Sequence, residues 1–411
     1  MQKPLTIFVH RASECLTDHE SHGDGLICFS LLNGLAERGH KVYAYANSAP
    51  IRECSPNLHV RTERHRVPAN SLAPWEYSWR AERWMRELER TTPFDLVWRM
   101  HPYGEGCPYP PQTLGKPLVI GPLFSEWPAD FSQPQGTGLP RYGVSLQGLV
   151  KPVARRGWQQ AMKAASLLIA ATDTRASALR AEAPQARTVT TPVIVDCPFL
   201  ENLSIRDVPN ASRPLRLIIA AHLVPNKNVN IFCETVKRLR EEGVDTEGII
   251  LGEGTGRADL EAYIAANGLG EAICLKGKLS HAQVWEHLHR ADILISCSGY
   301  EAYGRTIVEA MSVGTPAVCY QGSTGPAEII EDEENGLLVE ELTGSAYTKR
   351  ILTVLRTPGA WSRLSASALR KAESWRSGIV LSRLEESLYA AVADGEISRF
   401  RTGTGKIKNK V

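Results

Sequence analysis

The sequence lacks an apolar run long enough to cross a bilayer, and it lacks an excess of charge of either sign. A membrane-spanning helix needs roughly 20 predominantly apolar residues, and no segment of the 411 residues approaches that length. The formal net charge is +2, so nothing in the composition calls for a nucleic acid as partner. Hydrophobic residues make up 43% and charged residues 22% of the chain, a balance typical of a globular protein.

Metal-binding patterns are also missing. The nine cysteines are odd in number and have no metal-ligand spacing, and Cys274, Cys297 and Cys319 lie in apolar runs where a thiol acts as a small hydrophobe. No Asp-x-Asp follows an expected strand, and the acidic run Glu331–Glu334 is expected to be a solvated helix end. We therefore expect reduced thiols and no metal ion.

The N-terminus lacks a signal-peptide pattern, because Met1 leads directly into the strand-like run Leu5–Val9. We therefore expect a cytoplasmic protein. Residues 397–411 contain five basic residues and no acidic one. Two interpretations of this tail stay open, a disordered solvated segment and peripheral contact with the acidic inner membrane face.

Strand-like and helix-like segments alternate through both halves of the chain, which predicts an α/β protein with two doubly wound parallel sheets. Prolines and polar residues between 198 and 214 predict a hinge. The expected parts are an N-terminal domain (1–197), the hinge (198–214), a C-terminal domain (215–375), a last helix (376–395) and a basic tail (396–411).

Individual elements follow from hydrophobic periodicity. In the first half we expect strands at 5–10, 41–46, 95–98, 117–120, 167–171 and 189–195, with helices at 23–39, 76–90 and 149–165. In the second half we expect strands at 215–220, 247–251, 272–276, 293–296 and 316–320, helices at 229–242, 258–267, 282–290 and 306–313, and one long or kinked helix at 365–392.

The segment from Glu301 to Glu309 contains the strongest candidates for ligand-binding residues. It follows the apolar run Ile293–Ile295, and a helix-like pattern then ends at Gly314. The N-terminus of that helix offers unpaired N–H groups and a partial positive charge, which suit a phosphate. Two carboxylates flanking a phosphate pocket fit a ligand with hydroxyls on both sides of a diphosphate, as in a nucleotide sugar.

This segment, Glu-Ala-Tyr-Gly-Arg-Thr-Ile-Val-Glu-Ala-Met, resembles the spaced-glutamate motif of the retaining GT-B glycosyltransferases, in particular glycosyltransferase family 4. The resemblance implies two Rossmann-like domains that face each other across a cleft, with the acceptor bound by the first domain and the donor by the second. It implies that the last helix packs back on the first domain. The implied reaction moves a hexosyl unit from a nucleoside-diphosphate sugar to a hydroxyl of a glycan, a lipid-linked or a small-molecule acceptor, with retention and without a cofactor.

The resemblance also implies roles for individual residues. Lys227 matches a lysine that holds the donor diphosphate, and His222 stands where the family usually has an arginine. A histidine is mostly neutral at pH 7, so this departure leaves the strength of the donor activity open. Glu301 is expected to hold donor-sugar hydroxyls and Glu309 the ribose. Further donor contacts implied by the resemblance are Gly23, Gly254, Lys276, Tyr303, Gly304, Arg305 and Thr306.

Acceptor-side candidates lie in the first half. His101 ends a strand-like run, and Glu126 and Trp127 lie in a loop rich in proline and glycine. A helix with Trp75 and Trp84 among arginines is consistent with a lipid-linked acceptor, and core packing explains it equally well.

Two other functions share this architecture. A nucleotide-sugar 2-epimerase would use the same donor site. A non-catalytic nucleotide-sugar-binding protein would keep the site without turnover, and His222 in place of arginine favours that alternative.

Overall fold

The computed structural model describes residues 2–20, 23–63, 73–100, 113–124, 147–199, 203, 205–206 and 213–403. These residues form two compact units. Of the described residues, the first unit contains 2–124, 147–194 and 377–403, and the second contains 195–376. Each unit has its own parallel sheet.

The first unit is built on a seven-stranded parallel sheet in the order β3-β2-β1-β4-β5-β6-β7. Its central strands are buried apolar runs, as expected where helices cover both faces of a parallel sheet. The strands are β1 (Thr6–Arg11), β2 (Lys41–Ala46), β3 (Leu58–Thr62), β4 (Leu96–Arg99), β5 (Leu118–Leu123), β6 (Leu167–Ala170) and β7 (Arg187–Thr190).

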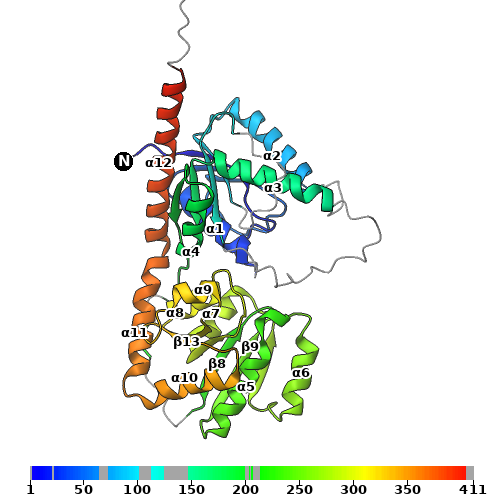
Figure 1. Cartoon of the computed structure of the whole chain (residues 1–411), viewed down its shortest axis with the longest axis vertical. Coiled ribbons are helices and arrows are strands. Elements are labelled where there is room, and N and C mark those ends of the chain that lie inside the picture. The colour runs from blue at the N-terminus through cyan, green and yellow to red at the C-terminus, as the bar shows by residue number, and fades with distance from the viewer. Residues whose placement is uncertain are drawn as a thin grey trace, which may run out of the picture. The chain divides into compact units, whose positions relative to one another are not determined.

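Helices cover both faces of this sheet (Figure 1). Phe8, Val97 and Ile120 point to one face, where they share a core with Met85 of α2 and Met162 of α3. The helices of the unit are α1 (Gly23–Glu37), α2 (Ala73–Glu89), α3 (Gln147–Ala164), α4 (Asp173–Glu182) and α12 (Ser377–Gly403).

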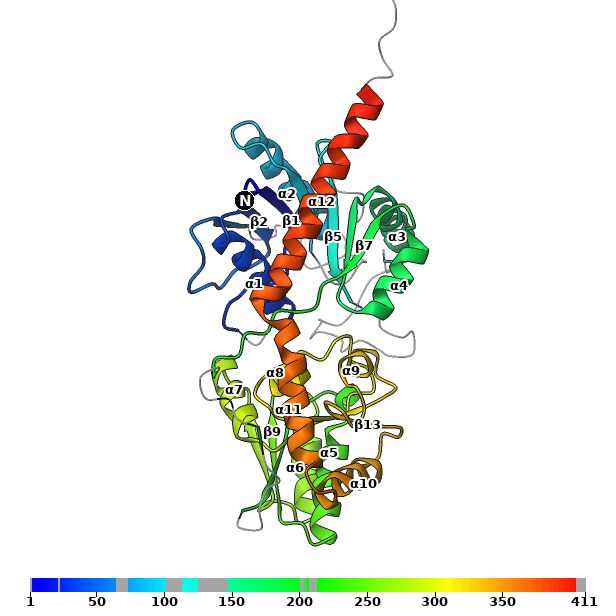
Figure 2. The same cartoon turned by 90° about the vertical axis from the view of Figure 1, so that its left-hand side faces the viewer.

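Helix α12 belongs to the first unit although it is last in the chain, and it packs beside α1 (Figure 2). A Cβ atom on Gly34 would lie 2.5 Å from Leu381, so glycine allows the two helices to approach closely. Glu385 accepts one hydrogen bond from Arg38 at 2.5 Å, and His40 contacts the same carboxylate at 2.9 Å. Leu384 is fully buried in this contact region.

The second unit has a six-stranded parallel sheet in the order β10-β9-β8-β11-β12-β13. The strands are β8 (Leu215–Ala220), β9 (Thr246–Leu251), β10 (Ile273–Gly277), β11 (Ile293–Ser296), β12 (Ala317–Tyr320) and β13 (Leu337–Val339). The helices are η3 (Pro225–Lys227), α5 (Val229–Glu241), α6 (Arg257–Ala266), α7 (His281–Arg290), α8 (Arg305–Ser312), α9 (Thr324–Ile329), α10 (Gly344–Arg356), α11 (Ala360–Ala372) and η4 (Glu373–Trp375).

Two expectations for the C-terminal part are wrong. The segment 365–392 is not one helix, because Arg376 has extended dihedrals (φ −65°, ψ 142°) between η4 and α12. The backbone carbonyl of the buried Trp375 accepts a hydrogen bond from the backbone N–H of Val195, a residue outside the helix, at 2.9 Å. The chain therefore leaves one unit and enters the other at this break.

The acidic run Glu331–Glu334 is a turn after α9 and not a helix end. Its carboxylates are paired with basic side chains of the helices that follow: Glu331 with Lys371 at 2.7 Å, and Glu333 with Arg350 at 2.8 Å. Gly336 closes the turn by accepting a hydrogen bond from the N–H of Glu333. The run is therefore part of the surface packing of the second unit.

Among the helices of the described residues, none combines the length and the apolar content that a membrane span requires.

The packing of α12 can be tested with Leu384→Ala. Removing a fully buried leucine side chain leaves a cavity, so we expect a loss of about 2–5 kcal/mol in the free energy of unfolding of the first unit. Urea titration followed by circular dichroism measures this loss. Glu386→Ala, at an exposed position of the same helix, is the control and should change stability by less than about 0.5 kcal/mol. Equal stability of the two variants would contradict the burial of α12.

Candidate functional site

The predicted donor residues of the second unit lie on loops at one edge of its sheet. Strands β8, β9, β10 and β11 are parallel, so the segments that follow them all leave from the carboxyl edge. The strand order reverses between β8 and β11. Ligands of doubly wound sheets bind outside the carboxyl ends of the strands at such a reversal.

Lys227 and Glu301 meet at this reversal. Lys227 ends the short helix η3 after β8, and Glu301 lies on the loop after β11. The ammonium group forms an ion pair and a hydrogen bond with Oε2 of Glu301, and the Ser298 hydroxyl donates to the same oxygen at 3.4 Å. The side chains are 17% and 26% exposed, so both remain accessible to a ligand.

Two asparagines hold these loops together. The side chain of Asn226 donates to the carbonyl of Tyr300 at 3.1 Å and accepts from the Tyr300 N–H at 3.2 Å. Asn228 has a left-handed backbone (φ 45°, ψ 44°), and its side chain donates to the Cys297 carbonyl at 3.0 Å. These bonds fix the position of Lys227 relative to the loop that carries Glu301.

Helix α8 begins next to this pair. Gly304 precedes it with φ 100° and ψ 53°, a conformation that glycine adopts at low cost. No side chain caps the helix, and the N–H groups of Arg305 and Thr306 come before its first helical hydrogen bond, which Ile307 donates to Gly304. The N-terminus of α8 therefore presents backbone donors and a partial positive charge.

Glu309 lies one turn into α8 and is 3% exposed. Its Oε1 accepts a hydrogen bond from Nε of Arg305 at 2.8 Å and lies 2.8 Å from Nε2 of His281. Burial alone raises the pKa of Glu309, but the hydrogen bond with His281 and the charge of Arg305 outweigh it, so the pKa lies below its ordinary value. Glu309 is therefore a carboxylate at neutral pH.

Arg305 keeps one unsatisfied donor in this arrangement. Its Nε is bonded to Glu309, whereas its Nη1 is buried and has no hydrogen-bond partner among the residues that the structure describes. A buried donor without a partner costs free energy and calls for an acceptor. Arg305 can thus bind an additional anion while it holds Glu309.

The glycine loop after β9 packs against the loop after β8. A Cβ atom on Gly252 would lie 1.9 Å from the carbonyl oxygen of Ala221, and one on Gly254 would lie 2.3 Å from that of Leu223. Leu223 also donates to the Glu253 carbonyl at 2.9 Å. These glycines permit contact between two backbones, so their packing role stands beside the predicted contact of Gly254 with the donor.

The structure brings some of the predicted residues together and leaves others apart. Tyr303 is buried, Gly304, Arg305, Thr306 and Glu309 share the start of α8, and Lys227 and Glu301 are paired beside it. His222 is exposed on the loop after β8, and Lys276 is exposed near the end of β10. Gly23 begins α1 in the first unit. His101, Glu126 and Trp127 lie outside the described residues.

His281 was not predicted from the sequence, and neither was the loop-fixing role of Asn226. His281 is the first residue of α7, after a capping box in which the Ser280 side chain accepts from the Gln283 N–H. The pattern Ser-x-x-Gln predicts that helix start. It does not predict the contact with Glu309, which depends on the packing of α7 against α8.

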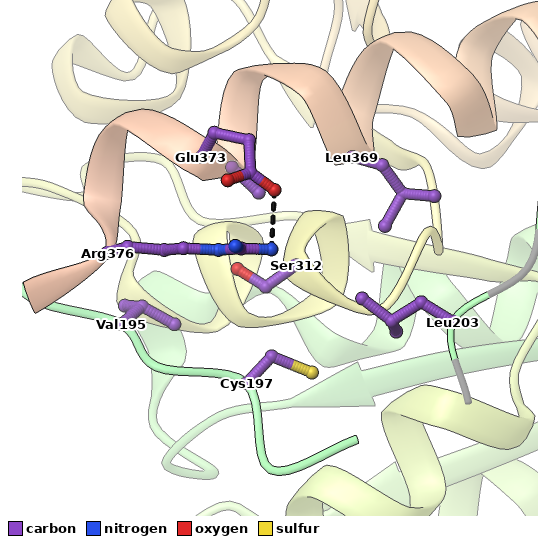
Figure 3. A pocket seen from close by; sticks show the side chains of 8 residues that line it. Val195, Cys197, Leu203, Ser312, Leu369, Glu373 and Arg376 are labelled. Carbon is purple, nitrogen blue, oxygen red and sulfur yellow. Dashed lines mark ion pairs between the residues drawn. The ribbon is translucent and has the colours of Figure 1, made fainter. Parts of the chain in front are cut away.

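A small pocket of the second unit lies elsewhere (Figure 3). Cys197, Leu369 and Ser312 are among its lining residues, and an ion pair between Glu373 and Arg376 lies beside it. Ser312 ends α8, roughly 12 Å along the helix from its N-terminus. This pocket therefore belongs to the opposite end of the helix from the paired charges. The described residues contain no group of three or more His, Cys, Asp or Glu side chains arranged to hold a metal ion.

Residues 202–371 match the family model described as Glycosyl transferases group 1. Among the similar curated proteins, an alpha-D-kanosaminyltransferase of Streptomyces kanamyceticus is 27% identical over 38% of this chain and 40% of its own length. The amylovoran biosynthesis glycosyltransferase AmsK of Erwinia amylovora is 32% identical over 37% of this chain and 38% of its own length. The chain thus spans about two fifths of the length of the curated relatives it matches.

Solved structures match over nearly the whole chain. The sucrose-phosphate synthase of Thermosynechococcus elongatus covers 95% of this chain and all of its own, with a TM-score of 0.67 and 16% identity. The Anabaena protein HepE in complex with UDP and glucose covers 94% of this chain and 99% of its own, with a TM-score of 0.65 and 16% identity. These similarities show that the chain has the GT-B fold, as its two parallel-sheet domains indicate.

The lowered pKa of Glu309 predicts a pH-dependent stability difference. A carboxyl group whose pKa falls on folding stabilises the protein above its ordinary pKa of 4.5, and this contribution is lost as the pH falls through the lowered value. Glu309→Gln should therefore be less stable than the parent by about 1.5–3 kcal/mol at pH 7. The difference should shrink below pH 4.5.

Urea unfolding between pH 7 and pH 3 measures this difference. Glu271→Gln, which changes an exposed carboxylate of the same unit, is the control and should follow the parent throughout. A stability gap for Glu309→Gln that stays constant over this range would contradict the charged state of Glu309.

Proposed function

From the match of residues 202–371 to group 1 glycosyl transferases, we propose that this chain moves a hexosyl unit from a nucleoside-diphosphate sugar to an acceptor hydroxyl, with retention of the anomeric configuration. The observation that carries the proposal is the meeting of Lys227, Glu301 and the uncapped N-terminus of α8 at the strand reversal, inside the matched region. Relatives described as glycosyltransferases and a structural neighbour bound to UDP and glucose support it.

The ion pair suggests how the donor enters the site. Lys227 forms an ion pair with Glu301. A diphosphate carries more negative charge than one carboxylate, so its oxygens would replace Glu301 as partners of the ammonium group. The released Glu301 carboxylate could then accept hydrogen bonds from the sugar hydroxyls. The exchange of Glu301 for the diphosphate on Lys227 would thus position both the diphosphate and the sugar of the donor.

Arg305 and the start of α8 would hold the rest of the diphosphate. The unsatisfied Nη1 of Arg305 and the N–H groups of Arg305 and Thr306 are donors for phosphate oxygens. Glu309 would accept a hydrogen bond from the ribose, and His281 and Arg305 would keep it ionised and oriented. These cations and backbone donors would balance the charge of the diphosphate, so we propose a reaction without a divalent ion or a cofactor.

The protein would then promote the chemical step by positioning the donor and by stabilising the negative charge of the leaving diphosphate. Negative charge grows on the nucleoside diphosphate as the sugar leaves it, and donors fixed in advance stabilise that charge most effectively. The leaving phosphate would accept the proton of the acceptor hydroxyl on the same face of the sugar, which gives retention without a nucleophile from the protein. Lys227, Arg305 and α8 would hold the diphosphate for this transfer.

The donor sugar, base and acceptor can be identified by direct screening. The chain is incubated with UDP-, GDP- and ADP-hexoses, and thermal shift then selects the nucleotide that stabilises it. Proton NMR of the reaction with a panel of glycan, lipid-linked and small-molecule acceptors follows the anomeric signal. A product with the donor's anomeric configuration supports the proposal. Formation of a 2-epimer without acceptor would indicate the epimerase, and binding without any turnover would indicate a non-catalytic protein.

The role of Lys227 predicts the effect of Lys227→Ala. Loss of one fixed donor to the leaving group should lower kcat by about two to three orders of magnitude. Lys237→Ala removes a partly exposed lysine from α5 of the same unit and should leave kcat within about twofold. Steady-state kinetics with the selected donor compares the two variants. Similar turnover of Lys227→Ala and Lys237→Ala would exclude the proposed role.

Independence from metal ions predicts that activity survives chelation. After treatment with EDTA and gel filtration, we expect the initial rate to remain within about twofold of the untreated rate, because the protein supplies the cations that face the leaving group. Restoration of a lost rate by Mg²⁺ or Mn²⁺ would show that a divalent ion takes part.

A further inference from the structure

Arg99 is a buried cation without a hydrogen-bond partner among the described residues. It is the last residue of β4 and has no solvent exposure. None of its three guanidinium nitrogens, Nε, Nη1 and Nη2, has a hydrogen-bond partner in the part of the chain that the structure describes. Arg99 belongs to the first unit.

Such an arrangement is costly unless a ligand completes it. A guanidinium group stays protonated in proteins and carries five N–H donors. Burial of a charge without a partner costs several kcal/mol, and proteins rarely retain one that serves no purpose. An oxyanion with two adjacent oxygens, such as a planar carboxylate or a tetrahedral phosphate group, accepts two parallel hydrogen bonds from a guanidinium group. Arg99 therefore has the chemistry of an anion site.

The surroundings of Arg99 carry charge of both signs, and the neighbouring Arg11 lies 3.9 Å from the carboxylate of Glu14. Arg11 is its partner in the register of β1 and β4, and its guanidinium carbon lies 5.2 Å from the ring centre of Tyr77. His10 is fully buried, and burial, with the charges of Arg99 and Arg11, lowers its pKa to about 3. His10 is therefore neutral at pH 7. Glu82 lies 3.9 Å from its ring and 3.8 Å from Arg86.

The position of Arg99 in the sheet is one where ligands bind. The order of the first sheet reverses between β1 and β4, so the carboxyl ends of these two strands form its switch point. Arg11 and Arg99 are the last residues of these strands. Helix α1 begins after the β1 loop on the same edge of the sheet.

We propose that the first unit binds a carboxylate or phosphate group on Arg99, with Arg11 beside it. Resting on the proposed function, this group belongs to the acceptor, so the acceptor is an acidic molecule. The residues that would bind this group belong to the first unit, whereas Lys227 and α8, proposed to bind the donor diphosphate, belong to the second. The acceptor class is thereby narrowed to glycans, lipids or small molecules that carry an acidic group.

Anion binding can be measured without donor or turnover. The full chain is heated in buffers of equal ionic strength that contain chloride, inorganic phosphate or malonate. Lys227→Met serves as the background, so that phosphate binding at the donor site is weakened. The double variant Lys227→Met/Arg99→Met is its matched partner. In the background variant, phosphate or malonate should raise Tm in a concentration-dependent manner. In the double variant this rise should be lost, with at least a tenfold weaker affinity.

Stability in chloride distinguishes a binding residue from a structural one. If Arg99 is a binding residue, its replacement by methionine should leave Tm in chloride unchanged or raise it. The free-energy cost of burying an unpaired charge then disappears. A lower Tm in chloride with an undiminished phosphate response would overturn the proposal. So would the absence of any anion response in the background variant.

A lysine substitution at position 99 controls for the possibility that the methionine variant misfolds. Lys227→Met/Arg99→Lys keeps a cation at the position but cannot form the bidentate pair, so it should fold and bind the anion at least tenfold more weakly than the background. Full binding by the lysine variant would contradict the guanidinium geometry. Because all arms measure binding alone, a failure here leaves the transferase assay unaffected, and a chain without transferase activity can still pass this test.

Discussion

The ion pair between Lys227 and Glu301 is the interaction on which the candidate site depends. It joins the loops that follow β8 and β11, the two neighbouring strands between which the sheet order reverses. Asn226 and Asn228 fix the same two loops through backbone hydrogen bonds. These hydrogen bonds fix the loop that carries Lys227 relative to the loop that carries Glu301. Under the proposed function, a diphosphate would replace Glu301 as the partner of this cation.

In the second cluster, two basic side chains, those of Arg305 and His281, contact one carboxylate, that of Glu309. Here the carboxylate is buried and takes hydrogen-bond contacts from both neighbours through one oxygen, so its ionised form is secured. Arg305 retains an unsatisfied nitrogen. One arginine can thus orient a carboxylate and still contribute to binding a phosphate. In the first unit, Arg99 is a similar case without any carboxylate partner among the described residues.

Sequence patterns predicted most elements that contain long apolar runs or strong helical periodicity. Strands β2, β8 and β11 have the predicted bounds, whereas α5 differs by one residue at its end and α8 by one residue at each end. Strand β3 was missed because it lies at the sheet edge with mostly exposed side chains, which weakens its hydrophobic pattern. The expected helix at 365–392 is wrong at Arg376, because the carbonyl of the buried Trp375 accepts a hydrogen bond from the N–H of Val195, a tertiary contact that helical periodicity does not report. His281 could not be found for the same reason, since its role depends on α7 packing on α8. The roles of the predicted site residues stay predictions.

The central claim is that the diphosphate of a nucleotide sugar binds at the carboxyl edge of the second sheet, where it replaces Glu301 as the partner of Lys227. The most direct measurement is a crystal structure with the nucleotide sugar that the thermal-shift screen selects. The account predicts phosphate oxygens within about 3.2 Å, the usual limit for such hydrogen bonds, of Lys227 Nζ and of a backbone nitrogen at the start of α8. It also predicts that the Glu301 carboxylate contacts the sugar. A nucleotide bound elsewhere, or an intact pair between Lys227 and Glu301 beside the bound donor, would contradict it.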